Sequence, residues 1–128
     1  MKLVLDTNVI VSAFINPEGK PSVILKMIIN RKAELIYNTV ILNEYENVLL
    51  RPKFSNKIDS GNICKFINLI RIIGTSFNTV PSKIKFLDES DRIFYDTAKE
   101  SGSILITGNI IHFPKESFIM TPADYLKK

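Results

Sequence analysis

Short apolar segments alternate along this chain with longer segments whose apolar residues recur at helical spacing, and no other feature constrains the fold as strongly. The apolar segments predict strands at residues 2–5, 34–37, 77–80, 103–106 and 117–120. The helical spacing predicts helices at residues 22–30, 40–50 and 60–73, from the acidic run 88–91 to about 101, and in one last turn after Thr121. Such alternation favours right-handed crossovers and a mostly parallel sheet with helices on both faces. We therefore expect an α/β fold with four or five strands in its sheet.

Capping and breaking residues predict the ends of three helices. Ser22 is expected to cap the helix at 22–30, and Asn38 with Thr39 the helix at 40–50. Pro52 is expected to end that second helix, because proline has no amide hydrogen to donate. Gly74 is expected to close the helix at 60–73 in the left-handed conformation that glycine adopts without strain.

Length and composition predict one domain, residues 1–128, because 128 residues with 45% apolar side chains can bury one substantial core. The single cysteine cannot form an intrachain disulfide and no signal-peptide pattern opens the sequence, so we expect a reduced, cytoplasmic protein. No apolar stretch approaches the roughly 20 residues of a membrane span. The net charge of +4 is compatible with a polyanionic partner and equally with simple solubility.

Polar side chains follow the carboxyl ends of two predicted strands, which is where open α/β sheets bind ligands. Asp6 comes directly after the strand at 2–5, and Asn109 follows the strand at 103–106. Glu44 and Asp91 lie early in helices near the same edge. Because the carboxyl ends of parallel strands meet at one edge of the sheet, we expect these four side chains to converge.

Three carboxylates in one place repel one another unless a cation lies between them. Magnesium prefers one or two carboxylates with waters and phosphate oxygens, and manganese accepts similar sites. With one histidine, His112, and one cysteine, the chain lacks the ligand cluster of a zinc site. The pattern therefore favours a site for a hard divalent cation.

Each acid could also have a purely structural role, such as helix capping, with no part in a functional site. Asp6 could cap a helical turn that follows it. The apolar stripe of the helix at 40–50 leaves both Glu44 and Glu46 on its flanks, so periodicity does not choose between them. Asp88 and Asp91 together resemble a capping box, and acids favour helix N-termini in any case.

Three further polar features carry the same ambiguity. Asp96 fits an acid on the helix surface or one that supports the site. The segment Thr107-Gly108-Asn109 could be only a tight turn, in which Gly and Asn supply positive φ. His112, next to Phe113 and Pro114, fits a structural loop histidine better than a general base.

Taken in order, several segments resemble the PIN-domain family of metal-dependent ribonucleases, and in particular the single-domain toxins of bacterial toxin–antitoxin pairs. The resemblance covers nearly the whole chain and is carried by residues 3–9, 43–45, 51–54, 91–96, 105–109 and 118–122. It implies a Rossmann-like three-layer sandwich with helices flanking a mostly parallel sheet. It also implies a ribonuclease that hydrolyses RNA phosphodiester bonds, a small antitoxin partner and a homodimer.

The resemblance also assigns the site. Asp6, Glu44 and Asp91 match the acidic positions that bind Mg²⁺ or Mn²⁺, which selects Glu44 over Glu46. Many members carry a fourth acid where this chain has Asn109, whose amide oxygen can still bind an ion or hold a water. The supporting residues are expected to be Thr7, Asn8, Asp96 and Thr107, and the contacts to the RNA backbone Arg92, Lys53 and Lys57. The rival interpretation is a catalytically weak or silent module that binds RNA or a protein, and Asn109 is its main support.

Overall fold

Five parallel strands form the centre of the molecule. A computed structural model describes residues 1–86 and 88–127. The strands follow the order β3-β2-β1-β4-β5, and every neighbouring pair is parallel. Their bounds are β1 (Lys2–Leu5), β2 (Glu34–Tyr37), β3 (Thr75–Ser76), β4 (Ile104–Ile106) and β5 (Ile119–Met120). The predicted α/β class with a parallel sheet is confirmed.

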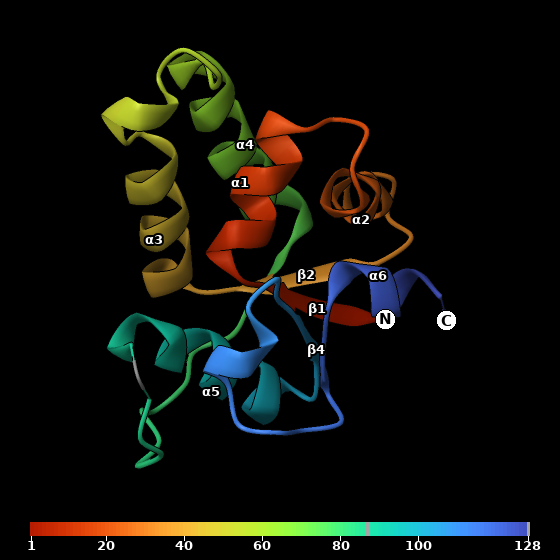
Figure 1. The fold of residues 1–128 in the computed structure, drawn as a ribbon, viewed down its shortest axis with the longest axis vertical. Coiled ribbons are helices and arrows are strands. Elements are labelled where there is room, and N and C mark those ends of the chain that lie inside the picture. Colours follow the sequence, from red (N-terminus) through yellow and green to blue (C-terminus); the bar gives the residue numbers. More distant parts are fainter. Residues whose placement is uncertain (87, 128) are drawn as a thin grey trace.

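Helices cover both faces of this sheet. They are α1 (Thr7–Ile15), α2 (Lys20–Ile29), α3 (Thr39–Leu49), α4 (Ser60–Ile73), α5 (Arg92–Ser101) and α6 (Pro122–Leu126), with 3₁₀ turns η1 (Pro52–Phe54), η2 (Glu89–Asp91) and η3 (Ile110–His112). Helices α1, α2 and α4 lie on one side of the sheet and α5 on the other (Figure 1). None of the described helices is both long and apolar enough to span a bilayer.

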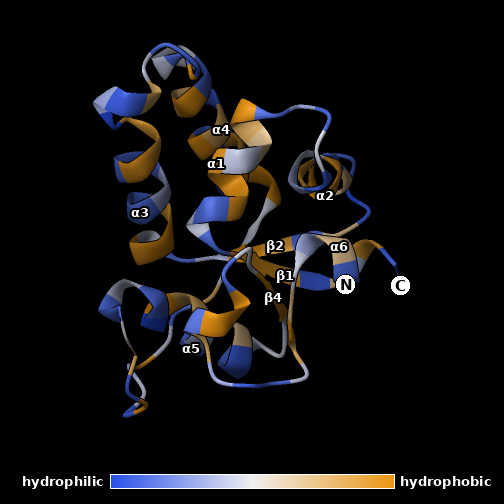
Figure 2. Cartoon of the chain, viewed as in Figure 1, coloured by the Kyte–Doolittle hydropathy of each residue, from blue (hydrophilic) through white to orange (hydrophobic). Residues whose placement is uncertain are grey.

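The central strand β1 anchors the hydrophobic core. Leu3, Val4 and Leu5 are fully buried, as expected for a parallel strand covered on both faces. The central strands are hydrophobic in Figure 2, while hydrophilic residues gather on the outer parts of the helices and in the loops. A rigid core therefore holds the carboxyl ends of β1 and β4, from which the polar residues follow.

The strand order reverses beside β1. The chain passes from β1 to β2 on one side, and later returns to place β4 on the other side of β1. In open α/β sheets ligands bind in the crevice outside the strand ends at such a reversal. The Asp6 amide donates to the Ile106 carbonyl at 2.9 Å, which ties together the two strand ends at this point.

Two predictions about the elements are wrong. The segment after Asp6 forms helix α1, whereas no helix was expected before residue 22. The strand predicted at 77–80 is absent from the described residues, and the third strand is instead Thr75–Ser76. Phe77 still donates its amide to the Tyr37 carbonyl at 2.8 Å, and the chain then leaves the sheet towards the loop before α5.

Of the predicted helix-end residues Asn38, Ser22 and Gly74, one is confirmed and two are wrong. Asn38 caps α3 as predicted, accepting a 3.0 Å hydrogen bond from the Ile41 amide. Ser22 is not a cap, because α2 begins two residues earlier, after Gly19. Gly74 is extended rather than left-handed, with φ −83°. Glycine is required there for space, since a Cβ would lie 2.8 Å from the Ile70 carbonyl oxygen and 2.9 Å from Tyr37 Cδ1.

Candidate functional site

Asp6 lies at the end of β1 and is almost completely buried. As the cap of α1, it accepts a 2.8 Å hydrogen bond on Oδ1 from the Thr7 amide. Its Oδ2 accepts a 2.7 Å hydrogen bond from Thr107 Oγ1 and a longer one, 3.4 Å, from Asn8 Nδ2. The capping interpretation is therefore correct as local structure. It does not exclude a chemical role, because the same carboxylate also lines a cavity.

The turn after β4 is tied to the segment after β1. Asn8 Oδ1 accepts a 3.2 Å hydrogen bond from the Gly108 amide, and Thr107 Oγ1 accepts one of 3.0 Å from the Asn109 amide. The segment 107–109 thus fixes Asp6. These bonds hold two strand ends, about one hundred residues apart in sequence, in one arrangement. The tight turn with positive φ at Gly108 and Asn109 is not found, because Asn109 has φ −117° and positive φ occurs among the described residues only at Arg31 and Gly102.

A cavity of about 400 Å³ opens at this edge of the sheet. It brings together all four predicted catalytic residues, Asp6, Glu44, Asp91 and Asn109. The residues around them on the cavity wall are Thr7, Asn8, Val11, Ser12, Val48, Arg51, Lys53, Phe54, Asp88, Ser90, Phe94 and His112. A larger cavity of about 640 Å³ lies between η3 and β5, but its lining is mostly apolar and contains a single carboxylate, Glu116. The acidic cavity is therefore the candidate site.

The carboxylates in this cavity influence one another. Burial raises the pKa of Asp6, and hydrogen bonds from Thr107 and Thr7 partly offset that effect. Burial also raises the pKa of Asp91 to about 6, with further contributions from the negative charges of Asp6, Asp88 and Glu44. Such coupling is typical of sites that neutralise several carboxylates with a cation.

Two buried oxygen atoms of this cavity have no partner. Among the residues that the structure describes, Thr7 Oγ1 and Asp91 Oδ2 are buried without a hydrogen bond. The nearest basic nitrogen to Asp91 Oδ2 among the described residues, Nδ1 of His112, lies 3.9 Å away, too far for a hydrogen bond. Buried polar atoms are rarely left unpaired, so these two oxygens are available to bind an ion or an ordered water in the cavity.

The donor set fits a hard divalent cation. Carboxylate, hydroxyl and amide oxygens are the ligands that Mg²⁺ and Mn²⁺ prefer. Within residues 1–86 and 88–127, no three His, Cys, Asp or Glu side chains lie close enough to bind one ion together. Mg²⁺ usually binds one or two carboxylates directly and contacts other groups through its waters. Such an ion fits both the oxygen-rich lining of the cavity and the spacing of its acids.

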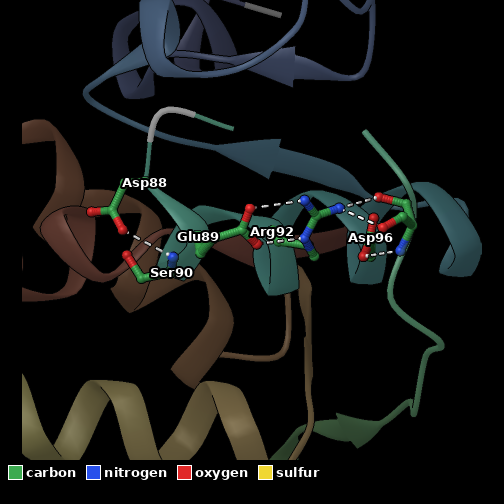
Figure 3. Close-up of polar contacts among 6 residues, drawn as sticks. Asp88, Glu89, Ser90, Arg92 and Asp96 are labelled. Atoms are coloured by element: carbon green, nitrogen blue, oxygen red, sulfur yellow. Dashed lines mark hydrogen bonds and ion pairs between the residues drawn. The ribbon is translucent and has the colours of Figure 1, made fainter. Parts of the chain in front are cut away.

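The remaining predicted residues separate into two groups. Thr7, Asn8 and Lys53 line the cavity, and Thr107 lies fully buried beneath Asp6. Lys57, Arg92 and Asp96 are outside its lining. The guanidinium of Arg92 is paired with Glu89 and Ser82, and Asp96 is buried and accepts a 2.9 Å hydrogen bond from the Ser82 amide (Figure 3).

Sequence reasoning did not assign five polar residues of the cavity wall to the site, namely Ser12, Arg51, Asp88, Ser90 and His112. Arg51 stands two positions before Lys53, which was predicted, and the proximity of the two was a usable signal. Asp88 was assigned only to helix capping. It does accept a 2.9 Å hydrogen bond from the Ser90 amide, but it faces the cavity as well.

Comparisons with known proteins identify the family of this chain and proteins similar to it. A protein-family model described as "PIN domain" matches residues 2–111. The uncharacterized protein MJ1680 of Methanocaldococcus jannaschii is 34% identical over 110 residues, which cover 85% of this chain and 71% of that protein. The crystal structure of VapBC2 from Rickettsia felis bound to a DNA fragment from their promoter matches with a TM-score of 0.62, covering 94% of this chain and 97% of that chain. At 13% identity this structural similarity shows the fold alone.

Proposed function

Because the chain belongs to the PIN-domain family, whose members are generally nucleases, we propose that it is a metal-dependent endoribonuclease and the toxin of a toxin–antitoxin pair. The observation that carries this proposal is the cavity at the carboxyl ends of β1 and β4. It combines several carboxylates with two buried oxygen atoms that lack partners among the described residues. A divalent cation satisfies both conditions at once.

Asp6, Glu44 and Asp91 are the proposed acids of the metal site, one or two of which bind the ion directly while the others contact its waters. The amide oxygen of Asn109 is a neutral ligand atom beside them. When bound, Mg²⁺ or Mn²⁺ lowers the pKa of a coordinated water and stabilises negative charge on the phosphoryl oxygens. The role of Thr107 and of the Thr7 amide is to hold Asp6 in one orientation through their hydrogen bonds. Thr7 Oγ1 offers one more oxygen at the cavity wall.

Basic residues on the cavity wall are suited to bind the RNA backbone. Arg51 and Lys53 are exposed there, and the Lys53 ammonium lies 5.1 Å from the centre of the Phe54 ring. Contacts between such cations and phosphates position a nucleic acid without selecting its sequence. We assign the backbone contacts to Arg51 and Lys53, because Arg92 already has protein partners and Lys57 lies outside the cavity lining.

The toxin role carries a proposal about partners. One structural neighbour is VapBC2 bound to a DNA fragment from their promoter, and this similarity supports the proposal of an antitoxin partner for this chain. An antitoxin that covers the acidic cavity would block access of RNA to Asp6 and Asp91. A homodimer and a cytoplasmic location stay predictions from the sequence.

A second candidate function rests on Asn109. A neutral side chain at this position lowers the negative charge of the cavity, which favours a catalytically silent module that binds RNA or a protein. RNA binding that does not depend on metal, together with no cleavage of any RNA tested, supports that alternative.

Cleavage assays test the main proposal. Structured and unstructured RNAs are incubated with the wild-type protein in Mg²⁺, with the wild-type protein in EDTA, and with the Asp6→Asn variant in Mg²⁺. The Asn side chain keeps an oxygen to cap α1, so the variant is expected to fold. We expect cleavage only by the wild-type protein in Mg²⁺. Equal cleavage under all three conditions would point to a contaminating nuclease and contradict the proposal.

A further inference from the structure

Asp88 is a fourth carboxylate on the wall of the acidic cavity. It lines the cavity together with Asp6, Glu44 and Asp91. It directly precedes η2, and its carbonyl accepts a 3.1 Å hydrogen bond from the Asp91 amide. The same wall holds Thr7, which is more than nine-tenths buried and whose Oγ1 has no hydrogen-bond partner among the described residues. The cavity thus carries one more negative charge than the predicted ligand set, and an unsatisfied oxygen beside it.

The Asp88 side chain is oriented by a hydrogen bond. Its Oδ1 accepts this bond from the Ser90 amide, and its other oxygen points away from Ser90 (Figure 3). The second carboxylate oxygen is therefore not used by the capping bond and can accept hydrogen bonds from a ligand of the cavity.

Two side chains of α5, Arg92 and Asp96, form a clamp that bonds to Ser82 and Glu89, which precede and follow Asp88 in the sequence. Arg92 donates to the Ser82 carbonyl at 2.5 Å and to Ser82 Oγ at 3.0 Å, while Asp96 accepts from the Ser82 amide. Arg92 also forms two hydrogen bonds with Glu89, at 2.8 and 3.1 Å, directly after Asp88 (Figure 3). Residues on both sides of Asp88 are thus held against one helix. The guanidinium of Arg92, which was predicted to contact RNA, bonds to Ser82 and Glu89 in this structure.

We propose that Asp88 is an acidic member of the metal centre that accepts hydrogen bonds from the waters of the bound divalent ion. This inference rests on the proposed function. Contact through water follows from two observations, that Asp88 is exposed and that no three acids of the described chain are close enough to share an ion directly. In a cavity where Asn109 is neutral, Asp88 supplies the additional charge.

Titration with MnCl₂, followed by isothermal calorimetry on the metal-free protein, tests this role. Asp88→Asn keeps an oxygen for the Ser90 amide and removes only the charge. We expect Mn²⁺ to bind the variant about 10-fold more weakly than the wild-type protein, as for other groups that hold a metal through its ligands. Asp124→Asn is the matched control, because it removes the same charge from an exposed site on α6, outside the cavity lining, and should leave the affinity unchanged.

The outcomes separate this inference from the proposed function. Unchanged Mn²⁺ affinity in Asp88→Asn, with binding lost in Asp6→Asn, overturns the role of Asp88 and leaves the metal centre in place. No Mn²⁺ binding by the wild-type protein overturns both. Equal weakening in Asp88→Asn and Asp124→Asn shows an effect of net charge alone and also overturns the role of Asp88. Weakening confined to Asp88→Asn supports it.

Discussion

Thr107 and Asp6 are 101 residues apart in sequence, and the hydroxyl of Thr107 donates a 2.7 Å hydrogen bond to the Asp6 carboxylate beneath the acidic cavity. Both side chains are buried, and they follow the two neighbouring strands β1 and β4. The bond favours the ionised form of Asp6 against the effect of burial. The pair connects the fold of the sheet directly to the charge of the candidate site.

Thr107→Val tests this connection. The substitution keeps the shape of the side chain and leaves Asp6 Oδ2 without its strongest partner, so we expect the free energy of unfolding to fall by about 1–3 kcal/mol. Mn²⁺ should also bind about 10-fold more weakly, because the carboxylate loses its orienting group. Urea denaturation and calorimetry measure the two effects. Thr107→Ser restores the hydroxyl and should recover both; a Ser variant as impaired as the Val variant would contradict this role.

Asp91 makes the stability of the metal-free protein depend on pH. Its pKa is raised to about 6 in the folded protein, so between its ordinary value and pH 6 the folded state binds more protons than the unfolded state. The contribution of Asp91 to stability is therefore greatest in acid and is lost as the pH rises through about 6.

Asp91→Asn should abolish this dependence. Measured by urea denaturation in EDTA, the variant gains stability over the wild-type protein as the pH rises from 4 to 6, and the difference is constant above that. The difference between the two proteins isolates Asp91 from the other titrating groups. Two stability curves that run parallel from pH 4 to 7 would show that Asp91 titrates normally.

Gly74 is required because a Cβ there would lack space, whereas Gly102 is favoured by its positive φ. One substitution at each position distinguishes the two reasons. Gly74→Ala places a Cβ against the Ile70 carbonyl and the Tyr37 ring, so we expect a loss of about 1–3 kcal/mol in unfolding free energy. Gly102 has φ 69° with open space around it, so Gly102→Asn should cost much less, because Asn tolerates the left-handed conformation. Thermal unfolding compares the two; equal losses would contradict the steric explanation for Gly74.

Arg51 should contribute to RNA binding through the phosphate backbone. In the Asp6→Asn background, where cleavage is blocked, we expect Arg51→Gln to weaken binding and to reduce the dependence of log K on log salt by about 1. Lys57→Gln removes one positive charge outside the cavity lining and is the matched control. Fluorescence anisotropy across a salt series measures both variants. A larger effect of Lys57→Gln than of Arg51→Gln would reverse our assignment.

The parallel architecture and the convergence of Asp6, Glu44, Asp91 and Asn109 were predictable because both follow from the alternation of elements. Polar residues after neighbouring parallel strands must meet at one edge. Helix α1 was not predictable by periodicity, because the run from Val9 to Ile15 is apolar on nearly all sides. Strand β3 has only two exposed residues, so it lacks the alternation by which strands are identified.

Residue roles that depend on loop packing were also beyond sequence reasoning. Arg92 looked like a free cation, but the loop before α5 folds back and brings Ser82 to its guanidinium. The same clamp turns Asp96 away from the cavity lining. Asp88 has a local capping role that is sufficient to explain it, and only the three-dimensional arrangement shows that it also lines the cavity with Asp91.

A crystal structure of the protein grown or soaked in MnCl₂ tests the central claim most directly, because the anomalous signal of manganese locates the ion without ambiguity. We predict an anomalous peak in the acidic cavity, within coordination distance of Asp6 or Asp91 and with ordered waters between the ion and Asp88. An ion bound only elsewhere on the molecule, or an empty cavity at saturating MnCl₂, would contradict the account.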